Sequence, residues 1–110
     1  MSTKDSRVDR LFDALSNVLR RQLLVALRDR TAAGELQVPL DAILDAMPVD
    51  TDAHHVQIGL VHNHLPRLSD YGYVEWDENR HTVSRGPRWT DIEPFLDERP
   101  VQLESVSEQT

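Results

Sequence analysis

The chain has 110 residues, 39% of them apolar, and no cysteine. This length predicts one small domain with a single modest core, and the lack of cysteine excludes disulfide bonds, thiolate catalysis and zinc sites built on cysteine. The first ten residues are polar, and no apolar run is long enough to span a bilayer. We therefore expect neither a signal peptide nor a membrane segment, and a soluble cytoplasmic protein.

The charge is acidic and unevenly distributed. The formal net charge is -7, with one lysine, Lys4, and more aspartate than glutamate. This composition is typical of proteins that work in molar intracellular salt, and the alternative interpretation is a lysine-poor genome. Residues 1–30 hold seven basic and four acidic residues, and residues 80–90 hold three arginines. Between them, residues 31–79 hold nine acidic residues and only one arginine, Arg67.

The first half of the chain predicts three helices and a short strand. Residues 1–7 are polar and expected to be flexible, and a helical apolar face then runs from Val8 to Leu15. Ser16 or Asn17 can cap a second helix that ends near Gly34, with its arginines, Arg20 among them, away from the apolar face. A brief strand over 35–39 and a helix over 40–47 follow.

A longer helix is predicted over 53–69. Its apolar stripe consists of Val56, Leu60, Val61, Leu65 and Leu68. Asp50, Thr51 or Asp52 can cap its start, Pro66 should kink its last turn, and Gly72 should end it as a C′ glycine.

A hairpin and a last helix complete the predicted domain, which runs over 8–98. Residues 73–78 alternate as a strand does, 79–80 give a turn, and 81–85 return. The sequence "TDIE" from Thr90 matches a capping box for a helix with an apolar face of Trp89, Ile92, Phe95 and Leu96. Residues 99–110 are expected to form an acidic disordered tail.

This order of elements predicts an α+β, mostly helical fold: a winged helix-turn-helix with a two-stranded β wing and a C-terminal helix. The stretch "LSNVLRRQLLVAL" resembles the first long helix of ArsR-type regulators, and "HLPRLSDYGYV" resembles the end of their recognition helix. Over 8–98 the chain is most similar to small haloarchaeal winged-helix domains of unassigned function. ArsR metal sensors often bind metal through cysteines, which this chain lacks.

The resemblance implies a DNA-binding transcriptional regulator, with helix 53–69 in the major groove and the wing over 73–85 on the backbone of double-stranded DNA. Asparagine suits adenine, whereas arginine suits guanine or phosphate. The candidate contacts are His55, Gly59, His62, Asn63 and Arg67 on the helix, and Arg80, His81 and Arg85 on the hairpin.

Two alternatives remain open at this level. The domain could be a protein–protein interaction module whose acids around the helix, among them Asp70 and Glu75, meet a basic partner. The apolar residues of the first and last helices could form a homodimer interface or only close the core of a monomer. They are Leu11, Phe12, Leu15, Trp89, Ile92, Phe95 and Leu96.

No motif predicts catalysis, a cofactor or a metal. The sequence has no nucleophile motif and no glycine-rich phosphate loop, so we expect no enzyme. His54, His55, His62 and His64 do not converge on one helix face, as a zinc site requires. Because His64 lies four residues from both Leu60 and Leu68, we expect a partly buried structural histidine there.

Overall fold

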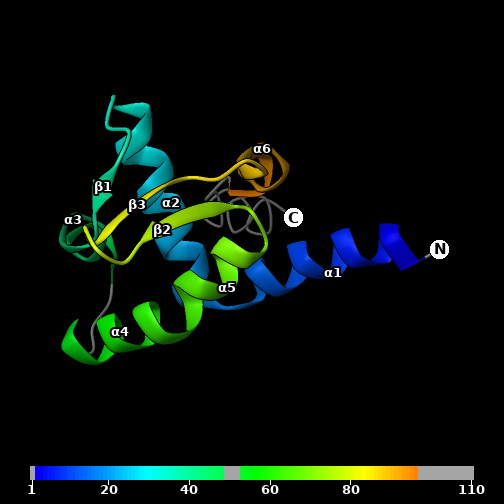
Figure 1. Cartoon of the computed structure of the whole chain (residues 1–110), viewed down its shortest axis with the longest axis horizontal. Coiled ribbons are helices and arrows are strands. Elements are labelled where there is room, and N and C mark those ends of the chain that lie inside the picture. Colours follow the sequence, from blue (N-terminus) through cyan, green and yellow to red (C-terminus); the bar gives the residue numbers. More distant parts are fainter. Residues whose placement is uncertain (1, 49–52, 97–110) are drawn as a thin grey trace, which may run out of the picture.

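The computed structural model describes residues 2–48 and 53–96. It is an α+β structure, mainly helical, with one small three-stranded antiparallel sheet (Figure 1). The predicted caps at Asp50, Thr51 and Asp52, and the predicted tail over 99–110, lie outside the described residues. The elements in chain order are α1 (Ser2–Ser16), α2 (Val18–Ala32), β1 (Val38–Pro39), α3 (Leu40–Ala46), α4 (Ala53–Gly59), the π-helical η1 (Leu60–His64), α5 (Leu65–Asp70), β2 (Val74–Asp77), β3 (Thr82–Arg85), α6 (Trp89–Ile92) and the 3₁₀ helix η2 (Glu93–Leu96).

The break between the first two helices lies where the sequence predicts it. The side chain of Asn17 accepts hydrogen bonds from the backbone N–H groups of Leu19 and Arg20, at 2.9 and 3.2 Å, and so caps α2. Helix α1 begins at Ser2, although residues 1–7 were expected to be flexible. No glycine or proline precedes Gly34 in the sequence, so nothing in the first residues interrupts a helix.

The sheet has three strands, not the predicted two. Its order is β1-β3-β2, so the return strand of the hairpin is central. Val38 of β1 lies opposite Val83 of β3, and both side chains are fully buried. Pairing these two valines covers an apolar strand edge that a free hairpin would leave open. The short strand was therefore predicted correctly, but its attachment to the hairpin was not.

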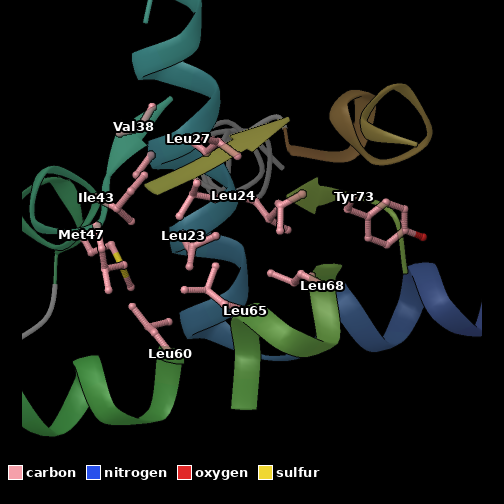
Figure 2. Close-up of a cluster of buried hydrophobic side chains, with 14 of the residues drawn as sticks. Leu23, Leu24, Leu27, Val38, Ile43, Met47, Leu60, Leu65, Leu68 and Tyr73 are labelled. Carbon is pink, nitrogen blue, oxygen red and sulfur yellow. The ribbon is translucent and has the colours of Figure 1, made fainter. Parts of the chain in front are cut away.

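The core is built around α2, which runs between the sheet and the helix formed by α4, η1 and α5 (Figure 2). Leu23, Leu24 and Leu27 of α2 are fully buried. Side chains from η1 and α5 approach them from one side, and side chains from β1 and α3 from the other. The helix from residue 53 to 70 is thus held to the domain along one face only.

Gly72 ends that helix as predicted. Its φ of +87° lies in the left-handed region that favours glycine. The N–H of Gly72 donates to the carbonyl of Ser69 at 3.0 Å, and the N–H of Tyr73 donates to the carbonyl of Leu68 at 3.1 Å. This pair of bonds is a Schellman motif, which turns the chain directly into β2.

A second close contact joins this turn to the segment after β3. The N–H of Gly86 donates to the carbonyl of Tyr73 at 2.9 Å, and the N–H of Arg88 donates to the carbonyl of Gly72 at 2.7 Å. A Cβ atom on Gly86 would collide with the carbonyl oxygen of Gly72. We call residues 72–73 and 86–88 the glycine seam, because only glycine allows these two stretches of backbone to approach so closely.

The last helix starts two residues earlier than the predicted capping box implies. Helix α6 begins at Trp89 with Arg88 as its N-cap, and no side chain caps it, so the predicted capping box at Thr90 does not form. Trp89 is buried, and the N–H of Trp89 donates to the carbonyl of Gly86 at 3.1 Å. Burial of the tryptophan and its link to the glycine seam therefore fix the start of the helix in place of a cap.

Candidate nucleic-acid interface

The outward side of helix 53–70 carries polar residues that have no partner in the described parts of the chain. Helix α4 extends away from the sheet (Figure 1). The side chains of His55, His62 and Asn63 are exposed and make no hydrogen bond or ion pair with the described residues. Together with Gly59 they form what we call the outer face. The structure thus brings together four of the five residues predicted on this helix.

Gly59 has no structural reason to be glycine. Its φ of -61° and ψ of -40° are ordinary helical angles, and a Cβ atom placed on it would meet nothing within 4 Å. Glycine within a helix costs about 1 kcal/mol relative to alanine. The residue therefore lowers the stability of the helix and leaves a stretch of backbone uncovered on the outer face.

The helix widens directly after Gly59. The N–H of Leu65 donates to the carbonyl of Leu60, five residues back, so η1 is a π-helical turn. Pro66 has no N–H to donate, and its ring crowds the carbonyl four residues before it. The predicted disturbance at Pro66 is present, but it takes the form of a widened turn before the proline. This turn lies at the position from which His64 reaches the interior.

His64 is buried, as the sequence predicts, with 7% of its surface exposed. Its Nδ1 lies 3.0 Å from Nη1 of Arg20. Because an arginine side chain always donates, Nδ1 accepts and the imidazole carries its proton on Nε2. Burial lowers the pKa of His64, and the charges of Arg20 and Arg67 lower it further. His64 is therefore a neutral acceptor that holds the π-helical turn to α2.

Arg20 was predicted to lie away from the core, and that prediction is wrong. Only 6% of the residue is exposed. Its Nη2 and Nε donate to the backbone carbonyl of Asp13, at 2.6 and 3.2 Å, while Nη1 faces His64. A guanidinium tolerates burial only when its N–H groups have acceptors. Here the end of α1 and η1 provide them.

Asp13 connects α1 to the end of the same helix. Its Oδ2 accepts from the hydroxyl of Tyr71 at 2.6 Å and from Nη1 of Arg67 at 3.0 Å. The hydrogen bond from Tyr71 holds the pKa of Asp13 below its ordinary value, and the charges of Arg67 and Arg20 act in the same direction. We call these four residues and His64 the Asp13 cluster. Arg67 is thus tied to α1 and is not part of the outer face.

At the hairpin, Arg80 and His81 lie at the tip. The side chain of Asp77 accepts from the backbone N–H of Arg80 at 3.1 Å, and the ring of His81 lies 5.4 Å from that of Trp76. The carbonyl of His81 accepts from the N–H of Leu40 at 2.9 Å. The tip is therefore fastened to the start of α3, with both predicted side chains exposed.

Arg85 does not join them. It lies at the base of the hairpin, where it pairs in register with Val74. Its Nε donates to the hydroxyl of Thr31 at 2.8 Å, and its guanidinium lies 5.1 Å from the ring centre of Trp89 and 3.7 Å from Glu93. Arg80 and Arg85 of the hairpin were expected to contact DNA together. Strand β3 separates Arg85 from the tip, and the side chain of Arg85 contacts residues of the domain itself.

Most residues of the predicted dimer interface are likewise occupied within the chain itself. Trp89, Ile92 and Leu96 are buried in the core of the chain itself, so the prediction is wrong for these three. Leu11 and Leu15 are partly buried against the same core. Of the predicted set, only Phe12 at 65% and Phe95 at 56% are strongly exposed.

Sequence reasoning missed Asp13 and Tyr71 entirely. The Asp13 cluster draws its members from α1, α2, η1, α5 and the residue after α5, and no spacing within one element relates all of them. The break at Ser16–Asn17 indicated a corner between two helices, but not which side chains meet there. Within residues 2–48 and 53–96, no group of histidine and acidic side chains could hold a metal ion. None of the described helices is long and apolar enough to cross a membrane.

These features define a small α+β domain with a polar helix face whose His55, His62 and Asn63 side chains have no partner among the described residues. Residues 12–84 match the family described as a domain of unknown function (DUF7344), and the chain belongs to that family. The matched segment contains the outer face and the whole Asp13 cluster. No curated protein and no solved structure matches the chain.

Proposed function

We propose that the chain is a winged helix-turn-helix, DNA-binding transcriptional regulator. In this proposal helix 53–70 enters the major groove and the tip of the β2–β3 hairpin lies beside the backbone. The order of α3, the longer helix and the hairpin supports the fold assignment. The observation that carries the proposal is the outer face, where polar side chains and exposed backbone stand together without a partner in the described chain.

The chemistry of the outer face suits a base edge. Asn63 can donate to and accept from adenine in the major groove, and His62 can donate to guanine or to phosphate. Gly59 would let a phosphate or base approach the helix backbone closely. Arg67 gives one N–H of its Nη1 to Asp13 and also interacts with Tyr71, but 43% of its side chain is exposed, so the guanidinium can still reach a phosphate.

The contacts of the hairpin side chains change which wing residues we propose for phosphate contact. Arg80 is exposed at the tip, so it is the wing residue that we propose for phosphate contact. Arg85 is left out because its guanidinium already binds within the domain. A homodimer, which would present two recognition helices to two half-sites, would rest on Phe12 of α1 and Phe95 of η2, the two strongly exposed residues of the predicted interface.

The test is selection of genomic DNA fragments on the purified full chain in molar potassium chloride. A His62→Ala/Asn63→Ala variant is run beside it, with Thr90→Ala on the exposed surface of α6 as the control. We expect enrichment of a discrete site that the double variant loses and the control keeps. A folded protein that enriches no site at any salt concentration would refute the proposal.

A protein–protein interaction module is the second candidate, and one observation favours it. Ile58 is an exposed, large apolar residue on α4, beside the outer face. Such a residue suits a protein partner better than a base edge or a phosphate. This alternative predicts that Arg67→Ala leaves binding of a basic partner intact, whereas Asp70→Lys with Glu75→Lys abolishes it.

A further inference from the structure

An apolar groove lies between α1 and the last helix, on the other side of the domain from α4 (Figure 1). Its volume is about 340 Å³. Tyr73 forms part of its floor: Figure 2 shows the ring at the edge of the core, with the hydroxyl pointing outward between α1 and α6. The lining residues are Arg7, Val8, Arg10, Leu11, Tyr73, Arg88, Asp91 and Phe95.

The charges around the groove are unbalanced. Arg7 lies 3.9 Å from Asp91, the only acid in the lining. Arg10 and Arg88 have no acidic partner among the described residues, and the stem of Arg88 packs beside Gly72. In a chain with a net charge of -7, two unpaired guanidinium groups beside an apolar floor form a local site for an anion.

We propose that this groove binds a small organic anion with a compact apolar body, of the aryl carboxylate class. The body would lie on Val8, Leu11 and Phe95, and the carboxylate would be held by Arg10 and Arg88, since guanidinium groups match carboxylate geometry. The volume is at the lower end of the range for ligand pockets, roughly 300–1,000 Å³, which favours a small ligand.

Tyr73 adds a hydrogen-bond donor at the floor. Burial raises the pKa of Tyr73, so its hydroxyl keeps its proton at neutral pH and can donate to an oxygen of the anion. No hydrogen bond of this hydroxyl is formed within the described chain. A neutral ligand of the same shape would fill the groove but leave the two arginines unpaired.

This site does not depend on the proposed DNA binding. The segment matched to the family is 12–84, and of the lining residues only Tyr73 lies within it. The groove is therefore built almost entirely from the parts of this chain that lie outside the family segment. We therefore expect this chain, and not the family in general, to bind the ligand.

The experiment compares phenylacetate with its neutral isostere phenylacetamide. The full chain, labelled with ¹⁵N, is titrated with each compound at the lowest salt concentration at which its amide spectrum is that of the folded protein. We expect phenylacetate to bind about fivefold more tightly, the advantage that one or two solvent-screened ion pairs give. The shifted amides should be those of residues around Leu11, Tyr73 and Arg88.

Two variants make the result specific. Arg10→Gln/Arg88→Gln removes both charges but keeps the aliphatic stems, so it should fold and should bind the two compounds equally. Arg80→Gln, at the tip of the hairpin, is the matched control and should keep the preference for phenylacetate.

Three outcomes would overturn the proposal. Equal affinity of the unaltered chain for both compounds would show that the arginines do not select an anion. Absence of shifts around the groove at any soluble concentration would show that nothing of this class binds. A dimer by light scattering, with the groove amides protected in it, would identify a second copy of the chain as the occupant.

Discussion

A single carboxylate, that of Asp13, fixes the relation between the first helix and the end of the helix that we propose reads DNA. It does so through Tyr71 and Arg67, while the backbone carbonyl of the same residue holds Arg20 and, through it, His64. Since each polar group in this cluster satisfies another, removal of one leaves its partners short of a hydrogen bond. The orientation of the outer face therefore depends on residues that do not belong to it.

The buried His64 predicts a dependence of stability on pH. Its pKa is lower in the folded chain than the ordinary value near 6.5, so the unfolded chain binds a proton first as the pH falls. The stabilisation is complete above about pH 6.5 and is lost as the pH falls from there towards the folded pKa. Urea unfolding at a series of pH values should show the loss, and His64→Gln should reduce it.

The control for this prediction is His62→Gln, because His62 is exposed on the outer face. That variant should show the same dependence on pH as the unaltered chain. Asp13 does not interfere in this range: its pKa is also lowered, so its contribution is lost only below its ordinary value near 3.8. An unchanged slope in His64→Gln would contradict the role given to the buried histidine.

At the scale of the element, helix 53–70 departs from regular α-helical geometry at the π-helical turn before Pro66, and Gly59 lowers its stability without changing its geometry. The sequence predicted the length of this helix and its buried stripe, because apolar residues recur with helical spacing. It predicted a kink but not a widened turn, since the choice between them depends on what the turn packs against. The sequence likewise did not predict that Arg20 is buried beside that turn.

The Gly59→Ala variant should change stability and DNA binding in opposite directions. Because the backbone is helical and the space beside it is empty, alanine should raise the free energy of unfolding by about 0.5–1 kcal/mol. If DNA approaches the backbone at this point, the same variant should bind the selected site more weakly, as measured by fluorescence anisotropy. Stabilisation with unchanged affinity would mean that no partner comes close to Gly59.

At the scale of the whole molecule, the acidic composition raises the question of how the chain could approach DNA. At molar salt the Debye length falls to about 3 Å, so distant carboxylates are hardly felt at the interface. The same screening weakens attraction between arginine and phosphate. Close contacts from the outer face would then contribute more than the net charge, which agrees with a face of His62 and Asn63 and few arginines.

The same composition predicts that salt stabilises the fold. With 19 acidic and 12 basic residues, repulsion between carboxylates opposes the compact state at low ionic strength. We expect the midpoint of urea unfolding to rise with potassium chloride, most steeply below about 1 M, where screening is still increasing. A midpoint that stays constant or falls over this range would argue against adaptation to molar salt.

The overall architecture was more predictable than the site. Capping by Asn17, the C′ role of Gly72 and the apolar stripes follow from local chemistry, and they place most helices correctly. Contacts between distant elements do not follow from local chemistry. The pairing of β1 with the hairpin, the link between Asp13 and Tyr71, and the contacts of Arg85 within the domain could not be inferred from the sequence.

The glycine seam has a consequence for the order in which the molecule opens. Its two hydrogen bonds join the end of helix 53–70 to the segment that leads into α6, with only the hairpin between them in the sequence. Neither side can separate without exposing the backbone of the other, so both should open as one cooperative unit. In native-state hydrogen exchange, the amide protons of Gly86 and Arg88 should therefore exchange through the same opening reaction, with the same free energy of opening.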